Sequence, residues 1–193
     1  MKPIILASQS PRRKELLARL GLVFTTIPAS IEENIASFQL PQTAVQEIAF
    51  QKARYVTDLL NDGLIIAADT VVVLKDTILG KPADEKHAYE MLTSLSGQEH
   101  TVITGICLMD AANGDYQVES EITKVKFREL SETEIRNYIA TGEPMDKAGS
   151  YGIQGRGALL VDRIEGCYYN VVGLPLTRLY LMLERYGIDL LGG

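Results

Sequence analysis

The sequence of 193 residues predicts an α/β protein with a mixed, bent sheet and flanking helices, arranged as two lobes around a cleft. In the first half, short apolar runs typical of buried strands alternate with stretches of helical spacing, which favours a partly parallel sheet. In the second half, two long strand-like segments flank a hairpin signal. No linker, repeat or low-complexity tract separates the lobes, so we expect a single domain over residues 1–193.

The chain opens with a strand, a tight junction and a helix. The apolar run at 3–7 reads as a short buried strand, and leucines at 16, 17 and 20 give the next segment a helical face. Ser10 is a natural N-cap, because its hydroxyl can accept from a free N–H of the first turn. Pro11 suits the first helical position, and Gly21 suits the end.

The elements up to residue 97 continue the alternation of strand and helix. A strand at 23–27 is followed by a polar loop at 28–42, and Thr43-Ala44-Val45-Gln46 resembles the capping box of a helix that runs to about Leu60. The fully apolar segment 64–68 predicts a buried strand. Apolar residues at 88, 91, 92 and 95 predict a helix that ends before Gly97.

The elements after residue 100 are predominantly strands at first. Long strands at 101–109 and 116–127 surround the turn sequence Ala112-Asn113-Gly114-Asp115. A capping box at 131–134 begins a helix that ends near Gly142. A glycine-rich segment at 149–157 leads to two short strands on either side of Glu165-Gly166, and Pro175 opens the last helix.

The composition indicates a soluble globular protein of a reducing compartment. Apolar residues make up 46% and the formal net charge is −6, which argues against broad electrostatic binding of nucleic acid. Cys107 and Cys167 belong to no metal-binding spacing, so we expect free thiols. No signal segment or run of membrane-spanning length is visible, and we therefore expect a cytoplasmic protein without membrane contact.

The strand-to-helix junction is the first candidate site. Arg12 and Arg13 fall in the first helical turn, where their charge opposes the helix dipole. A bound polyanion would explain this arrangement, because it would meet free N–H groups, hydroxyls and two guanidinium groups at one point. The alternative is a solvated basic turn without a ligand.

Asp69 is the second candidate, because it interrupts the apolar run from Leu64 to Leu74. Burying a carboxylate costs several kcal/mol unless it is paired, hydrogen-bonded or bound to a metal. We expect Asp69 at the carboxyl end of the strand, where ligands collect in open α/β sheets. It would act as a metal ligand or general base, or alternatively would only cap a turn.

Two lysines add to this set. Lys52 lies on the apolar face of its helix, seven residues after Val45, so its side chain either snorkels to solvent or enters an internal polar cavity. Lys81, in Gly80-Lys81-Pro82 after another short strand, could contribute a further cation.

The remaining candidates are acidic and glycine-rich. Either Glu32 or Glu33 could join Asp69 as a hard oxygen ligand for Mg²⁺ or Mn²⁺, although adjacent acids in a polar loop are usually solvated. The segment Gly152–Gly157 lacks dinucleotide-fingerprint spacing and instead allows close approach of backbone to a ligand. Gln154 offers an amide to a base edge. Cations, carboxylates and this loop together suit a metal-bridged nucleoside triphosphate.

These residues also resemble a known family. The chain is similar to the Maf family of septum-formation-inhibitor-like nucleoside triphosphate pyrophosphatases, and the matching blocks run in order through nearly the whole chain. They are Ser8-Gln9-Ser10-Pro11-Arg12-Arg13, Glu32-Glu33, Lys52-Ala53, Ala68-Asp69-Thr70, Gly80-Lys81-Pro82, Leu95-Ser96-Gly97, Asp146-Lys147-Ala148-Gly149, Tyr151-Gly152-Ile153-Gln154-Gly155 and Val172-Gly173-Leu174-Pro175.

The resemblance implies a fold like that of the inosine-triphosphate pyrophosphatases, a homodimer, and hydrolysis of a nucleoside triphosphate to monophosphate and pyrophosphate with Mg²⁺ or Mn²⁺. It also implies a role for each matched residue. Catalytic roles fall on Asp69 as base, Glu33, Lys52 and Lys81, metal binding on Asp69 and Glu33, and substrate binding on Ser8, Arg12, Arg13, Thr70 and Gln154.

Three of these positions distinguish subgroups of the family. Arg12, Thr70 and Gln154 resemble the group that prefers dTTP and UTP, whereas a group similar to 7-methyl-GTP hydrolases has Trp, Gln and Glu there. The alternative function is a nucleotide-binding regulator of cell division without significant turnover. Such a sensor does not need the buried Asp69, whereas catalysis does.

Overall fold

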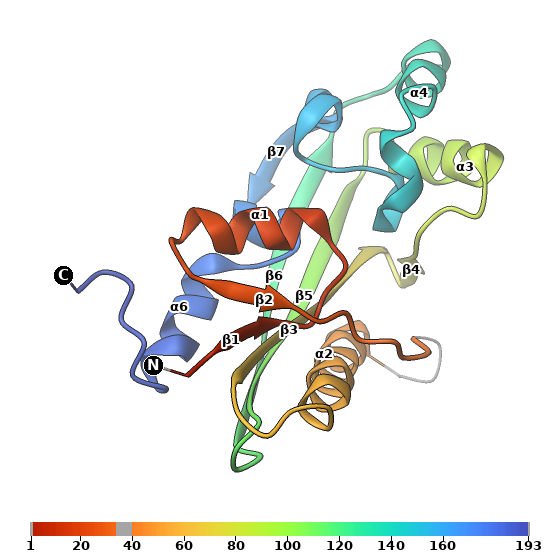
Figure 1. Cartoon of the computed structure of the whole chain (residues 1–193). Helices are drawn as coiled ribbons and strands as arrows, with labels where there is room; N and C mark the ends of the chain where they lie inside the picture. Colours follow the sequence, from red (N-terminus) through yellow and green to blue (C-terminus); the bar gives the residue numbers. More distant parts are fainter. Residues whose placement is uncertain (1, 34–39, 193) are drawn as a thin grey trace. The chain divides into compact units, whose positions relative to one another are not determined.

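The computed structural model describes residues 2–33 and 40–192 and shows an α/β protein with one mixed sheet of seven strands (Figure 1). The strands are β1 (Ile4–Leu6), β2 (Phe24–Thr26), β3 (Leu64–Leu74), β4 (Thr77–Leu79), β5 (Glu99–Asp110), β6 (Tyr116–Phe127) and β7 (Val161–Glu165). Their order is β2-β1-β3-β5-β6-β7, and β4 also pairs with β3. β1 is parallel to β2 and β3, whereas the β3–β4 and β6–β7 pairs are antiparallel. The α/β class and the mixed sheet are confirmed.

Helices connect these strands as the periodicity predicts. Ser10 caps the first of them by accepting from Arg13 N–H at 3.5 Å, and Pro11 occupies its first turn. The helices are α1 (Pro11–Arg19), α2 (Pro41–Thr57), α3 (Glu85–Leu95), α4 (Glu132–Ile139), α5 (Tyr168–Val172) and α6 (Leu176–Glu184), with short 3₁₀ helices η2 (Glu143–Asp146), η3 (Ala148–Ser150) and η4 (Gly155–Leu160). No helix of the described residues is long and apolar enough to cross a membrane.

The chain forms two compact units. Unit 1 comprises Met1–Asp69, Thr104–Glu121 and Gly173–Gly193, and unit 2 comprises Thr70–Ile103 and Ile122–Val172. Strands β3, β5 and β6 each contribute residues to both units.

Three expectations from the sequence were wrong at element boundaries. β3 does not end at Ala68 but continues to Leu74, because the apolar run resumes after Asp69 and Val72–Leu74 pairs with β4. Helix α2 begins at Pro41 without a side-chain cap, so the Thr43 capping box does not form. The segment after Gly166 forms helix α5 instead of a strand, with Asn170 donating to the carbonyl of Val102. Residues 34–39 of the predicted polar loop lie outside the described residues.

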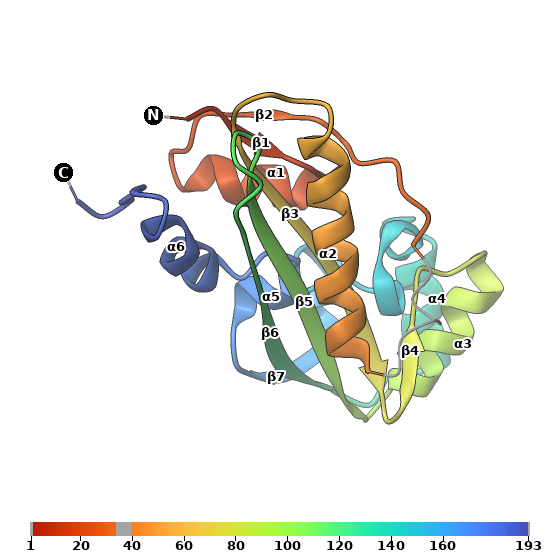
Figure 2. The ribbon, with the colours of Figure 1, turned by 90° about the horizontal axis from the view of Figure 1, so that it is seen from below.

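In unit 1, helix α2 packs directly on the sheet, and its buried face lies against β3 and β5 (Figure 2). The two backbones approach closely at Gly105 of β5, where an added Cβ would lie 2.3 Å from the carbonyl oxygen of Val45. Only glycine therefore allows the backbone of α2 to come this near. The apolar cluster of this unit joins Ala49, Ala53 and Val56 of α2 to Ile65 of β3 and Cys107 of β5.

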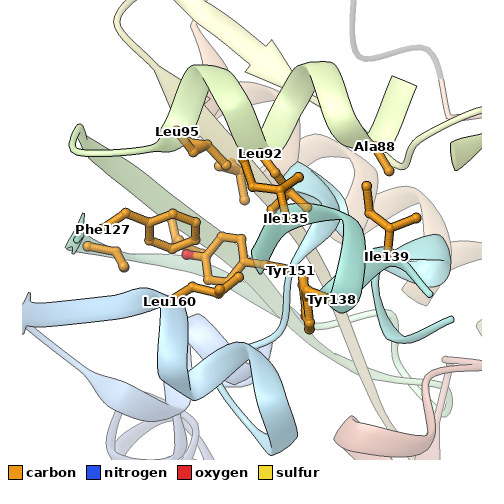
Figure 3. Close-up of a cluster of buried hydrophobic side chains, with 12 residues drawn as sticks. Ala88, Leu92, Leu95, Phe127, Ile135, Tyr138, Ile139, Tyr151 and Leu160 are labelled. Carbon is orange, nitrogen blue, oxygen red and sulfur yellow. The ribbon is translucent and has the colours of Figure 1, made fainter. Parts of the chain in front are cut away.

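Unit 2 has its own apolar core, centred on aromatic side chains (Figure 3). The rings of Phe127 and Tyr151 lie 4.7 Å apart in an edge-to-face arrangement. His100 is buried against both rings, and its Nε2 lies 2.7 Å from the hydroxyl of Tyr151. Its Nδ1 has no hydrogen-bond partner among the described residues. Burial lowers the pKa of His100 to about 4, so the imidazole stays neutral at neutral pH.

We predict that His100 makes the fold sensitive to mild acid. Between pH 6.5 and 4 the unfolded chain protonates this imidazole while the folded chain does not, so the free energy of unfolding falls as the pH decreases. His100→Gln should therefore lose about 2 kcal/mol less stability than the wild type between pH 6.5 and 4.5. Urea unfolding at both pH values measures the difference, and an equal loss in both proteins would contradict the prediction.

Candidate active site

The N-terminus of α1 places Arg13 inside unit 1. The side chain is buried, its Nε donates to the carbonyl oxygen of Gly173 at 2.8 Å, and its Nη1 donates to Ser8 Oγ at 3.3 Å. Ser8 Oγ also accepts from the Ser10 N–H at 3.2 Å. The sequence predicted the basic turn, but these contacts show that Arg13 is fixed in place by the fold.

The electrostatics of Arg13 identify its neighbours. Burial lowers the pKa of the Arg13 guanidinium, and the charge of Arg12 lowers it further, whereas Asp69 and Glu33 raise it. Arg13 therefore lies near two carboxylates of the same unit. The interpretation of the junction as a merely solvated basic turn is wrong for Arg13, because its side chain is buried. The side chain of Arg12 is half-buried.

Lys52 of α2 lies at the centre of these charges. Its Nζ is 2.7 Å from Asp69 Oδ1 and 2.7 Å from Glu33 Oε1. The Lys52 and Asp69 side chains are buried, whereas the Glu33 side chain is 45% exposed. Lys52 thus points into a buried polar cluster, and the alternative that it snorkels to solvent is wrong.

Asp69 occupies the middle of β3, not its carboxyl end as the sequence predicted. The residues on both sides belong to the strand, so Asp69 does not cap a turn. The carboxylate is tolerated there because the ammonium group of Lys52 compensates its charge. A strand interior also holds the carboxylate more rigidly than a loop would.

The carboxylates of Asp69 and Glu33 fit the metal site that the sequence predicted, provided that a ligand supplies further oxygens. Within residues 2–33 and 40–192, no group of three or more His, Cys, Asp or Glu could hold a metal ion. Mg²⁺ is commonly bound by only one or two carboxylates together with phosphate oxygens and water. Both carboxylates meet at Lys52 Nζ, so they point to a common place.

Three predicted site residues belong to unit 2. Thr70 directly follows Asp69 in β3, Lys81 is exposed in the segment between β4 and α3, and Gln154 is half-buried immediately before η4. Within this unit, the Gly80 carbonyl accepts from the Gly149 N–H at 3.0 Å, which ties the Lys81 segment to the start of the glycine-rich stretch.

The structure thus brings five of the predicted residues together in unit 1: Ser8, Arg13, Glu33, Lys52 and Asp69. Glu32 is exposed. The sequence did not predict two residues that hold other predicted site residues or segments in place. Gly173 acts through its backbone carbonyl, and the only signal was its place in a motif. Glu143 accepts from backbone N–H groups of the glycine-rich segment.

Comparison with known proteins gives matches over the full length of the chain. A sequence model described as Maf-like protein matches residues 3–186. A dTTP/UTP pyrophosphatase of Syntrophomonas wolfei is 50% identical over 186 residues, which cover 96% of this chain and 98% of the relative. Relatives with the same name from Pelotomaculum thermopropionicum and Moorella thermoacetica are 51% and 50% identical, and cover 99% and 100% of this chain and 100% and 99% of their own length.

We predict that the two members of the buried pair differ in their effect on stability. Lys52→Met leaves the Asp69 carboxylate without its ammonium partner and should lower the free energy of unfolding by about 3–5 kcal/mol. Asp69→Asn should cost less, because Lys52 keeps its contact with Glu33. Urea unfolding of both variants and of the double variant measures the coupling. Additive effects of the two changes would show that the pair does not contribute.

Proposed function

Because the chain belongs to the Maf family, we propose that it hydrolyses dTTP and UTP to the nucleoside monophosphate and pyrophosphate. The family assignment that the motifs predicted is confirmed by the match over residues 3–186. The relatives named dTTP/UTP pyrophosphatase support the substrates. The observation that carries the proposal for this chain is the Asp69 carboxylate, buried in a strand and hydrogen-bonded to Lys52. A protein that only senses nucleotide does not need such a group.

Asp69 is the proposed general base. Its Oδ1 accepts from Lys52, which leaves the second carboxylate oxygen for a water molecule. The water loses its proton to Asp69 and attacks the α-phosphorus, so that the bond to the β-phosphate oxygen breaks and pyrophosphate leaves. Lys52 fixes the carboxylate and contributes a positive charge as the charge on the phosphates redistributes.

The start of α1 is the proposed phosphate site. Arg12, Arg13 and Ser8 would contact phosphate oxygens there, and the positive end of the α1 dipole adds to the attraction. Arg13 comes to this role pre-positioned, because Gly173 and Ser8 already hold its guanidinium. Lys81 is the further cation of the proposed set.

Asp69 and Glu33 would hold a divalent cation, Mg²⁺ or Mn²⁺. Such an ion, when bound, screens the charge of the phosphate oxygens. Glu33 suits this part because its carboxylate is partly exposed while its Oε1 lies at the buried cluster.

Base selection is assigned to Arg12, Thr70 and Gln154. The amide of Gln154 offers a donor and an acceptor, as the mixed edge of uracil or thymine requires. Gln154 makes no side-chain hydrogen bond within the described residues, so this amide is available to a ligand. A fold like that of the inosine-triphosphate pyrophosphatases and a homodimer stay predictions of the resemblance. A single domain over residues 1–193 and a cytoplasmic location stay predictions of the sequence.

The products test the proposal directly. With Mg²⁺ or Mn²⁺, dTTP should give dTMP and pyrophosphate, and ¹⁸O from labelled water should appear in dTMP if water attacks the α-phosphorus. Mass spectrometry of the products measures both. Release of dTDP and orthophosphate would reject the proposed pyrophosphatase activity. Binding of dTTP without turnover would favour the alternative function, a nucleotide-binding regulator.

We predict that Asp69→Asn lowers kcat by roughly two to four orders of magnitude, the usual range for loss of a general base. The amide keeps an oxygen that can accept from Lys52, so the variant should keep the fold while its kcat falls. Steady-state kinetics with a far-ultraviolet circular dichroism spectrum check the prediction. Near-normal turnover in a folded variant would show that Asp69 is structural.

A further inference from the structure

The structure assigns a positioning role to Glu143: we infer that its carboxylate anchors the segment Gly152–Gly157 and thereby sets the place of Gln154 for base selection. The inference rests on the proposed function, in which Gln154 reads the base. Every residue of the anchor lies in unit 2.

The Glu143 carboxylate accepts hydrogen bonds from the backbone just after Gln154. Its Oε2 accepts from the Arg156 N–H at 3.1 Å, and its Oε1 accepts from the Gly157 N–H at 3.1 Å. Oε1 also accepts from the hydroxyl of Tyr138 at 3.0 Å. That hydroxyl in turn accepts from the Gly152 N–H at 3.2 Å. The segment is therefore held on both sides of Gln154 by one carboxylate and one phenol.

The glycines of this segment are explained by the anchor. A Cβ at Gly157 would lie 2.0 Å from the carbonyl oxygen of Gly152 and 2.7 Å from the hydroxyl of Tyr138. A Cβ at Gly155, which has φ +61°, would lie 3.0 Å from Glu143 Oε2. The backbone thus packs so closely on the anchor that no side chain can intervene.

The anchor is itself fixed to the core of unit 2. The ring of Tyr138 belongs to the apolar cluster around Phe127 and Tyr151 (Figure 3). Burial raises the pKa of Tyr138 above its usual range, which keeps the phenol protonated as a donor to Glu143. The carbonyl oxygen of Glu143 accepts from Lys147 Nζ at 2.6 Å, so the backbone of the anchor is held as well.

A free Gln154 amide needs this kind of support. The side chain makes no hydrogen bond within the described residues, so its position depends on the backbone that carries it. Two charge-assisted hydrogen bonds from positions 156 and 157 hold that backbone more firmly than neutral ones would. Loss of one of them should let the amide shift and weaken its discrimination between base edges, while the groups around Asp69 stay as they are.

The test compares dTTP with dCTP, which share the triphosphate and the sugar and differ in the 5-methyl group and at the base edge that Gln154 would read. Glu143→Gln keeps the side-chain size but replaces one acceptor oxygen by an NH₂ group, which faces an N–H donor. We expect the ratio of kcat/KM for dTTP over dCTP to fall roughly tenfold, mainly through KM for dTTP, with kcat within about threefold of the wild type. Tyr138→Phe should change the ratio in the same direction.

Glu134→Gln is the matched control. Glu134 also accepts from a backbone N–H and from an arginine in unit 2, but at the N-terminus of α4 and not at the glycine-rich segment. It should lower the melting temperature without changing the dTTP/dCTP ratio. Gln154→Ala provides the upper limit, and the change in Glu143→Gln should not exceed it.

A folded Glu143→Gln variant with the wild-type ratio overturns the inference, and so does an equal change in Glu134→Gln. The dissociation constants of dTTP and dCTP, measured by calorimetry in the presence of EDTA, distinguish failure of the inference from failure of the proposed function. If the wild type hydrolyses neither nucleotide, the pyrophosphatase proposal fails, and the binding ratio in wild type and Glu143→Gln decides the role of Glu143. A wild type that prefers neither nucleotide in either assay also overturns the inference.

Discussion

The ion pair between Lys52 and Asp69 is the interaction on which the candidate active site depends. A carboxylate in the interior of β3 is costly unless a charge of opposite sign reaches it, and the ammonium group of Lys52 does so at 2.7 Å from α2. The same ammonium contacts Glu33, and Arg13 is close enough for its pKa to respond to both carboxylates. Four charged groups from a helix start, a loop, a helix face and a strand are therefore linked, so none of them can be understood alone.

Much of the fold and part of the site could be predicted, because some features are visible in the order of residues along the chain. Lys52 interrupts the apolar stripe of a helix and Asp69 interrupts an apolar run, so both stand out from their neighbours. Ser10 and Pro11 mark the start of α1 through local capping chemistry. The contact between Lys52 and Asp69 was not predictable in this way, since it depends on how α2 packs on β3.

The errors have the same physical origin. The strand was predicted over 64–68 with Asp69 at its carboxyl end, where ligands collect in open α/β sheets, yet the pairing of Val72–Leu74 with β4 continues it. Asn170 fixes α5 by donating to Val102, which is distant in sequence. Glu143 was missed because its partners are backbone N–H groups 13 and 14 residues later, and a backbone donor carries no residue-type signal.

The close approach at Gly105 has a consequence for the charged cluster. Val45, which the backbone of β5 approaches there, lies seven residues, or about two helical turns, before Lys52 on the same face of α2. The distance between helix and sheet at this point therefore also governs how far the ammonium group must reach to the carboxylate of β3. A side chain at Gly105 would therefore force α2 away from the sheet and lengthen the reach of Lys52 to Asp69.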